Sequence, residues 1–349
     1  MSRSALTKNV AVTRPAPPVG RVRSILRDLA LIPVIVLVFI FGAIFVPNFA
    51  TANNIISNIL SVSAVLGVAV VAQSIVLIGG YFDLSAQSTI GLAPMFMVWL
   101  YTTDGGVGIV TNPWLAILSA LILGAVVGLV NGLLVGRLGM NAFIVTLAML
   151  ILLQGFTLGI SGGQTFTDLP GPVAELGFAK VLGIPVDVII LVLVVALAAV
   201  FMKFAPTGRR IYAMGGNKEA ARAAGIDTLR LTIGLFVFSG VAAAFAGLML
   251  SARIAAVTSS QGNNIIFTVF AAAVIGGISL DGGKGTIIGA ATGVLLLGMI
   301  QNILVLSAVP SFWIDATYGA IILGALLIGS TQVRGLFAGL PRRSRSRTT

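Results

Sequence analysis

The chain alternates long apolar stretches with short polar segments along most of its length. A membrane-spanning helix needs about 20 mostly apolar residues, and stretches of that kind recur. They run roughly over residues 29–47, 54–78, 84–102, 113–136, 142–160, 185–203, 231–251, 263–280, 286–307 and 313–330. This pattern predicts an all-α polytopic membrane protein with about ten transmembrane helices. The third and eighth stretches contain Gly, Pro or polar residues, so we expect some helices to be broken where protein or water covers the freed backbone.

One polar segment, Pro206–Asp227, separates the chain into two apolar halves. Within it, Asn217 suits a helix N-cap, and Glu219 falls in the first turn, where its charge matches the helix dipole. Alanines follow, and Gly225 is placed to end the helix. We therefore expect a surface helix of about two turns. Because so short a helix is unstable alone, it must pack on this protein's own spans or on another subunit; a plain solvated loop is the alternative.

The basic residues indicate which side this segment faces. The sequence holds 21 Lys and Arg against 10 Asp and Glu. With ten spans, every basic residue except Lys180 and Arg253 falls on one side, and basic loops mark the cytoplasmic side. Both termini are therefore expected in the cytoplasm. Residues 1–28 are predicted to be a disordered basic tail, 29–332 the transmembrane domain with a cytoplasmic segment at 204–230, and 333–349 a second basic tail.

The composition excludes several kinds of chemistry. Hydrophobic residues make up 58% of the chain and charged residues only 9%, against about 25% charged in soluble domains. The chain has no Cys and no His, which removes thiolate sites and the commonest general base and metal ligand. We predict no catalytic residue, metal or cofactor. The positive balance is ascribed to membrane topology rather than to nucleic-acid binding.

The sequence LDGGKGT around Lys284 resembles a phosphate-binding loop. The motif G-x-x-x-x-G-K-[ST] would need Gly at position 278 and Ser or Thr at 285, where this chain has Ile278 and Gly285. We therefore expect a hairpin turn, and ATP hydrolysis is not expected in this chain.

Polar side chains inside apolar stretches are costly, so their positions are informative. Neutral amides occur at Gln73, Asn131, Gln154 and Asn302. They are candidates for lining a pathway for an uncharged polar solute, and hydrogen bonding between helices is the alternative for each. No acidic side chain is expected deep in the spans, since Asp83 is assigned to an inner turn. That absence weighs against a carrier coupled to protons or sodium.

Glycine patterns indicate close packing and a short internal echo. Pairs spaced four apart let helices approach each other, and we expect packing rather than function from them. They are Gly124/Gly128, Gly128/Gly132, Gly132/Gly136 and Gly289/Gly293. The triplet IGG occurs at Ile78–Gly80 and again at Ile275–Gly277, which raises the possibility of two five-span repeats. The segment 161–185, rich in turn formers, is predicted to be an outer loop or a docking surface for an external partner.

Several stretches resemble one transporter family. The segment GRRIYAMGGNKEAARAAGID resembles the cytoplasmic coupling segment of permeases in the ribose/xylose/galactoside class of ATP-binding-cassette importers, within the branched-chain amino acid/monosaccharide permease superfamily. The stretches FVFSGVAAAFAGLMLSARI, AAAVIGGISLDGGKGTIIGAATGVLLLGMIQN and PSFW are similar to the second half of that family, and GLVNGLLVGRLGMNAFIVTLAML and ISGGQT to its first half. The resemblance covers nearly the whole chain after about residue 50.

The resemblance implies a permease, not an enzyme, in a bacterial inner membrane. It would import a sugar or related neutral solute by ATP-driven alternating access, together with a second permease copy, ATPase subunits, a periplasmic or lipid-anchored solute-binding protein and membrane lipid. The residues implied in ATPase coupling are Gly215, Gly216, Asn217, Lys218, Glu219, Ala220, Ala221, Arg222 and Gly225.

The solute itself is left open because the chain departs from the family pattern. It reads GGYFDLSAQS at Gly79–Ser88, where the family often reads GGIDLSVG. It also has QGNN before its eighth span, where the family often has an acidic turn. The alternatives are a nucleoside or branched-chain amino acid permease of the same superfamily, an ion-coupled secondary carrier, or a membrane scaffold without transport activity.

Overall fold

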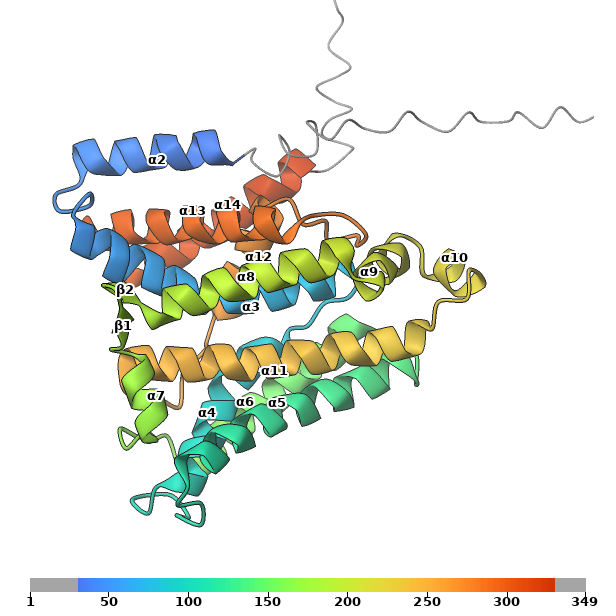
Figure 1. Cartoon of the computed structure of the whole chain (residues 1–349), viewed down its shortest axis with the longest axis horizontal. Helices are drawn as coiled ribbons and strands as arrows, with labels where there is room; N and C mark the ends of the chain where they lie inside the picture. The colour runs from blue at the N-terminus through green and yellow to red at the C-terminus, as the bar shows by residue number, and fades with distance from the viewer. Residues whose placement is uncertain (1–30, 330–349) are drawn as a thin grey trace, which may run out of the picture.

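A computed structural model describes residues 31–329 of the chain, and these residues are predominantly helical. Figure 1 shows long helices lying side by side, with a few short elements at their ends. The long helices and the two shorter apolar ones are α2 (Ile32–Phe45), α3 (Ser61–Ile78), α4 (Ser85–Tyr101), α5 (Pro113–Gly136), α6 (Ala142–Ser161), α8 (Val186–Phe204), α11 (Thr228–Ile254), α12 (Ile265–Ile275), α13 (Ile287–Leu306) and α14 (Ser311–Gly329). The predicted tails 1–28 and 333–349 lie outside the described residues.

Within this range, six helices are long and apolar enough to cross a membrane. They are Asn54–Ile78, which joins the π-helical turn η1 (Asn54–Leu60) to α3, and α5, α6, α8, α11 and α13. The apolar helices α2 and α12 are shorter, with 14 and 11 residues. The two interrupted stretches form α4, which has Pro94 inside it, and α12.

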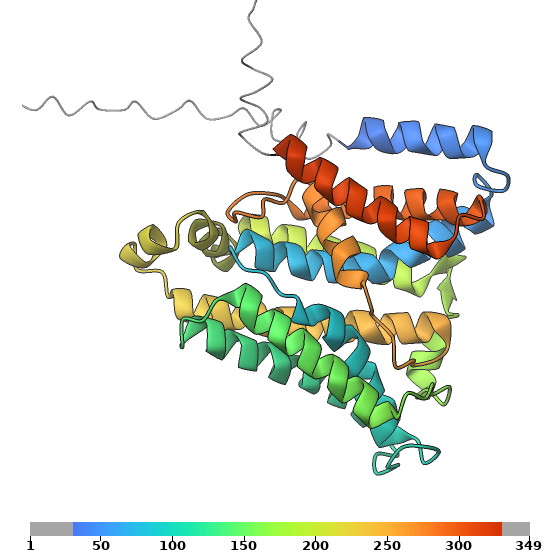
Figure 2. The same cartoon turned by 180° about the vertical axis from the view of Figure 1, so that it is seen from behind.

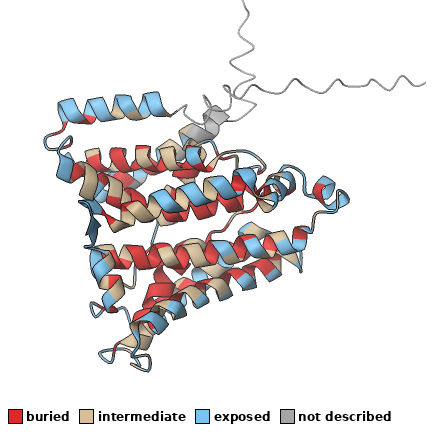
Figure 3. Cartoon of the chain, viewed as in Figure 1, coloured by how far each residue is buried: buried red, intermediate tan, exposed pale blue. Residues whose placement is uncertain are grey.

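Helix α3 lies at the centre of the molecule. Every residue of α3 except Val62 is buried, and the helix packs against α8, α11, α12 and α13. By contrast, only Val188 and Met202 are buried in α8, which lies on the outside (Figure 3). The exposed side of α8 is apolar, which suits a helix that faces lipid, because the hydrocarbon of a bilayer offers polar side chains no hydrogen-bonding partners.

The glycine stripe of α5 packs closely against another helix, as predicted, and that helix is α11. Cβ atoms added at Gly124 and Gly128 would meet the backbone carbonyl groups of Gly240 and Phe236. Gly289 and Gly293 of α13 face α12 in the same way. The absence of side chains at these positions therefore allows the helix backbones to touch, which confirms a packing role.

The short elements lie at opposite ends of the helices. Helices α9 (Pro206–Gly216) and α10 (Lys218–Ala223) project at one end. Helix α7 (Gly171–Leu176) and the hairpin of β1 (Lys180–Val181) with β2 (Ile184–Pro185) lie at the other (Figure 1). We call these the α9–α10 end and the hairpin end. Of the described Lys and Arg residues, only Lys180 and Arg253 lie at the hairpin end.

Candidate functional site

The α9–α10 end carries the segment that the sequence singled out, and part of it differs from the prediction. Residues 206–216, expected to be a polar loop, form the helix α9. Pro206 occupies its first turn, and Gly208, Ile211 and Met214 are buried on one face. A buried face with this three- and four-residue spacing is the pattern of an amphipathic helix. The sequence did not reveal this helix, because polar residues and glycine make up most of the segment.

Helix α9 is held by a junction of glycines, which we call the glycine junction: Gly80, Gly215, Gly282 and Gly283. The backbone N–H of Gly283 donates to the Ile78 carbonyl oxygen at 2.8 Å. Gly215 lies directly against both of these groups, and a Cβ there would overlap them. Gly80, Gly282 and Gly283 have φ values of 83°, 84° and 67°, which favour glycine. The turn around Lys284 therefore needs its glycines for close backbone contact, and it is a turn, as predicted, rather than a phosphate loop.

The two IGG triplets end α3 and α12 with the same backbone geometry. Gly79 N–H bonds the Ile75 carbonyl, and Gly276 N–H bonds the Ala272 carbonyl, at 3.0 and 2.9 Å. The glycine that follows each has a positive φ, 83° at Gly80 and 85° at Gly277. Both helices thus stop at a left-handed glycine, and both lead into segments that reach the glycine junction.

Helix α10 forms where the sequence placed a short helix. The Asn217 side chain accepts the Ala220 N–H at 2.9 Å, Glu219 lies in the first turn, and Gly225 follows the end with φ 80°. These caps are confirmed, although α10 has six residues and is shorter than the two turns expected. Within α10 only Ala221 is buried, and Figure 3 shows the helix mostly exposed at the tip of the molecule.

One charged side chain of α10, Glu219, is available for a partner, whereas Lys218 and Arg222 make contacts within the chain. Lys218 lies over the Tyr81 ring at 5.2 Å, and Arg222 Nη2 donates to Thr228 Oγ1 at 3.4 Å. The exposed Glu219 carboxylate forms no ion pair with another described side chain; the ion pair that is present joins Arg230 and Asp227. An exposed short helix with an unpaired acid and several small side chains can enter a groove on another protein.

The interior contains a buried acid, which corrects the expectation that none lies deep in the spans. Residues 79–84 turn back into the molecule between α3 and α4 (Figure 2), and Asp83 is 1% exposed. Its carboxylate accepts from the hydroxyl groups of Ser85 at 2.5 Å and of Ser239, near the middle of α11, at 2.6 Å. It also accepts the Ser85 N–H at 3.1 Å. The sequence pattern placed Asp83 in an inner turn between two spans. Hydropathy alone cannot show that the chain folds back into the protein after a helix ends.

Two of the four candidate amides lie beside Asp83. With its amide turned so that both ends are satisfied, Gln73 donates to the Asp83 carbonyl at 3.1 Å and accepts the Asp83 N–H at 3.3 Å. Asn131 Nδ2 donates to Ser85 Oγ at 2.8 Å. Both amides are almost wholly buried, so this arrangement fits the interhelical role better than a pathway role.

The other two amides lie apart from these. Asn302 of α13 and Asn54 of η1 form a reciprocal pair, with hydrogen bonds of 2.8 and 3.0 Å. This pair is nearly buried and has no free amide end. Gln154 of α6 is half-buried and donates to Asn263 at 3.3 Å. Only Gln154 among the four thus lies at an accessible surface.

Gln154 marks a polar groove that the sequence reading missed. A cavity of about 330 Å³ lies beside the start of α12, and its polar lining includes Arg253, Asn263, Asn264, Thr268, Gln301 and Ser311. Helix α12 begins in the interior of the molecule rather than at its edge (Figure 2). We call this cavity the polar groove. The signal that could have revealed the groove is the polar sequence QGNN directly before an apolar run.

The loop before α12 is fixed from within. Gln261 is buried, and its Nε2 donates to the Gly247 carbonyl at 3.0 Å and to Ser251 Oγ at 2.9 Å. Asn264, with φ 64°, then turns the chain into α12. Amide and hydroxyl groups beside the Arg253 guanidinium form a hydrogen-bonding surface that can bind hydroxyl-bearing solutes.

At the hairpin end, the segment 161–185 is more structured than a plain loop. It contains α7 and the hairpin, and Phe166 forms a β-bridge with Val257. The hairpin turns at Leu182, which has φ 53° and is 98% exposed. Phe178 and Ile184 are also exposed beside it. An apolar tip on a rigid hairpin is a feature of contact surfaces.

Spans broken around polar side chains, and a polar helix projecting at one end, are features found in membrane transport proteins. Residues 55–331 match the family described as branched-chain amino acid transport system / permease component. The chain belongs to this family.

Its relatives include importer permeases. It is 34% identical to the ribose import permease protein RbsC of Escherichia coli (strain K12) over 307 residues, which is 87% of this chain and 93% of that protein. It is 32% identical to the L-arabinose ABC transporter permease protein AraH of Azospirillum brasilense, over 91% of each chain. The autoinducer 2 import system permease protein LsrC of Yersinia pestis (strain Pestoides F) is 34% identical over 77% of this chain and 75% of its own length. No solved structure matches the chain.

Proposed function

We propose that this permease belongs to an ATP-binding-cassette importer and carries a sugar or related neutral polar solute into the cytoplasm. The observation that carries the proposal is α10, a capped, exposed helix that projects beyond the spans and follows α9, which rests on their ends through the glycine junction. The relatives named above as ribose, L-arabinose and autoinducer 2 permeases support the same class of solute. The permease itself moves the solute, and separate ATPase subunits hydrolyse ATP.

The proposed topology has ten spans over residues 29–332, with the segment 204–230 and both termini in the cytoplasm of a bacterial inner membrane. The concentration of basic residues at the α9–α10 end supports this orientation. The IGG echo pairs the second span with the eighth, whereas two five-span repeats would pair the second with the seventh. The echo therefore supports a shared turn geometry rather than a repeat.

The proposed pathway runs along the polar groove and is closed by a second copy of the permease. Helices α6, α12 and α14 form the face seen in Figure 2. Gln154 of α6 bonds Asn263, and Asn263 and Gln301 line the polar groove, although polar side chains are costly on a lipid-facing surface. Burying these amides against a second copy would enclose a set of hydrogen-bonding groups that also includes Arg253. Gln154 is retained as a pathway residue, and Gln73, Asn131 and Asn302 are assigned to holding the helices.

The partners follow from the two ends. ATPase subunits would receive α10 with Asn217–Gly225, and a periplasmic or lipid-anchored solute-binding protein would meet the hairpin end around Leu182. The apolar hairpin tip and α7 supply a rigid contact surface for it.

A nucleoside or branched-chain amino acid permease of the same family is the nearest alternative. An ion-coupled carrier can no longer be set aside for want of a buried acid, because Asp83 is one. However, its carboxylate already accepts three hydrogen bonds from Ser85 and Ser239, which leaves little capacity for a transported cation. ATP dependence of uptake separates the two mechanisms.

The test uses the permease reconstituted in proteoliposomes with the ATPase and solute-binding protein encoded beside its gene. Glu219→Arg should abolish ATP-driven uptake while ATP hydrolysis and membrane insertion persist, because the contact on α10 is lost. Asp104→Arg makes the same charge change at an exposed carboxylate in the loop between α4 and α5, away from the glycine junction, and should preserve uptake. Equal uptake by the two variants would refute the coupling role, and uptake driven by an ion gradient without ATP would refute the importer assignment.

A further inference from the structure

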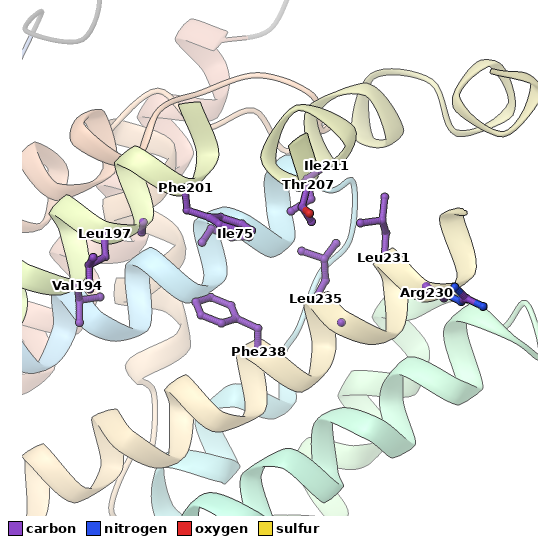
Figure 4. Close-up of a pocket in the computed structure, with 12 residues that line it drawn as sticks. Ile75, Val194, Leu197, Phe201, Thr207, Ile211, Arg230, Leu231, Leu235 and Phe238 are labelled. Atoms are coloured by element: carbon purple, nitrogen blue, oxygen red, sulfur yellow. The ribbon is translucent and has the colours of Figure 1, made fainter. Parts of the chain in front are cut away.

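A second, apolar groove lies between α8 and α11 near the α9–α10 end. Its volume is about 500 Å³, within the range of about 300–1,000 Å³ that ligand pockets occupy. Figure 4 shows Phe201 of α8 and Phe238 of α11 on its two walls and Ile75 of α3 at its floor. Among its lining residues only Thr207 and Arg230 are polar. We call it the lateral groove.

The lateral groove is not suited to the transported solute. Its walls offer almost no hydrogen-bonding groups, and Leu197, Phe201 and Phe238 are exposed along its opening. It opens between α8 and α11, the face seen in Figure 1, whereas α6, α12 and α14 form the opposite face in Figure 2. A second copy is therefore expected on the other side, and the surface at the lateral groove faces lipid.

The α9–α10 end of the groove is basic. Arg230 lines the groove from the first turn of α11, and its side chain is 89% exposed. Its Nε bonds the Asp227 carboxylate at 3.1 Å, which uses only part of a guanidinium with five N–H donors. Lys203 and Arg210 are exposed at the same end, on α8 and α9. A hydrocarbon-lined groove that ends at exposed cations is complementary to an acyl chain with an anionic headgroup.

We propose that the lateral groove binds an acyl chain of an anionic phospholipid, whose phosphate group contacts Arg230. The chain would lie against Ile75, Leu235 and Phe238 and fill a space that α8 and α11 leave between them. Its headgroup end would meet Thr207 and Ile211 of α9. The bound lipid thereby contacts the helix that α10 extends, so its occupancy affects the coupling segment.

Gly234 allows a direct test. A Cβ at this position meets nothing within 4 Å, so Gly234→Leu fills the groove without moving the backbone. Val192→Phe is the matched control, because it adds bulk to an exposed position on the opposite side of α8. Native mass spectrometry of the purified full chain with added phosphatidylglycerol or phosphatidylcholine counts the retained lipids. Gly234→Leu should weaken phosphatidylglycerol binding about tenfold, as excluding two methylene groups does, and Val192→Phe should leave it unchanged.

A second pair of variants tests the headgroup and does not depend on the groove's packing. Arg230→Gln should weaken phosphatidylglycerol binding about fivefold and leave phosphatidylcholine binding unchanged. Arg137→Gln, which removes another exposed cation from the same end, should have no effect. Equal lipid retention by Gly234→Leu and Val192→Phe, or by Arg230→Gln and Arg137→Gln, would overturn the proposal. So would a change of oligomeric state in Gly234→Leu, since the groove would then be an interface between copies.

Discussion

Two neighbouring glycines in α9 predict opposite outcomes for the same substitution. A Cβ at Gly215 would overlap the Ile78 carbonyl oxygen and lie 2.8 Å from the Gly283 nitrogen, whereas one at Gly216 meets nothing within 4 Å. The Ile78 and Gly283 groups bond each other at 2.8 Å, so a methyl group at position 215 must push apart a hydrogen-bonded backbone pair. Gly215→Ala therefore strains the glycine junction, and Gly216→Ala does not.

The loss of stability in Gly215→Ala can be estimated from three contributions. Overpacking costs about 1–3 kcal/mol, and weakening one backbone hydrogen bond costs about 1 kcal/mol more. Replacing Gly by Ala in a helix returns about 0.5–1 kcal/mol. Gly215→Ala should therefore destabilise the junction by about 1–3 kcal/mol, and Gly216→Ala, at the last residue of α9, should be neutral or slightly stabilising.

Thermal unfolding of the purified variants and ATP-driven uptake in proteoliposomes measure the two consequences. Gly215→Ala should lower Tm and reduce uptake per ATP hydrolysed, because α9 no longer rests on the end of α3. Gly216→Ala should match the unsubstituted protein in both assays. If Gly215→Ala behaved like Gly216→Ala, the close contact at the glycine junction would be wrong.

Three further outcomes are expected. Asp83→Ala should lower stability by about 1–3 kcal/mol, seen as a lower Tm, since it strands the buried hydroxyl of Ser239; an unchanged Tm would place Asp83 at a solvated surface. Asn302→Leu alone should destabilise the protein because Asn54 loses two hydrogen bonds and keeps those to the Phe49 carbonyl and to Asn58. In a double-mutant cycle with Asn54→Leu, the two losses should be less than additive; additive losses would contradict a direct pair. Leu182→Gly should raise or preserve Tm, because glycine avoids the backbone strain of about 1 kcal/mol that the left-handed conformation imposes on leucine. The same substitution should lower uptake, because it removes the apolar tip proposed to meet the binding protein. Uptake equal to that of the unsubstituted chain would exclude that contact.

The sequence predicted what depends on local rules. Helical hydropathy located the apolar helices, and cap chemistry placed the start of α10 at Asn217. Spacing of glycines predicted close helix packing, which the structure shows between α5 and α11. Each of these rests on a residue and its neighbours within one or two helical turns, which a pattern can capture.

What the sequence did not reveal depends on where the chain re-enters the molecule. Asp83 is buried because residues 79–84 fold back toward α11, and Asn263 lies in the polar groove because α12 starts inside the protein. Such positions follow from tertiary packing against helices far away in sequence. Helix α9 was missed for a different reason, since its exposed polar face outweighed the buried Ile211 and Met214.

These missed features combine into a route from the ATPase side to the solute side. We propose that force on α10 passes through α9 to the glycine junction, where Gly215 contacts both the end of α3 and the turn that follows α12. Helix α12 is only 11 residues long, and its other end begins at Asn264 in the polar groove. A short helix with one end at the junction and the other in the groove would convert a shift at the α9–α10 end into a displacement of the amides in the polar groove. The eighth predicted span contains only the short helix α12, and the proposed coupling requires this. A longer, unbroken helix would end at the far surface of the molecule and not in the polar groove.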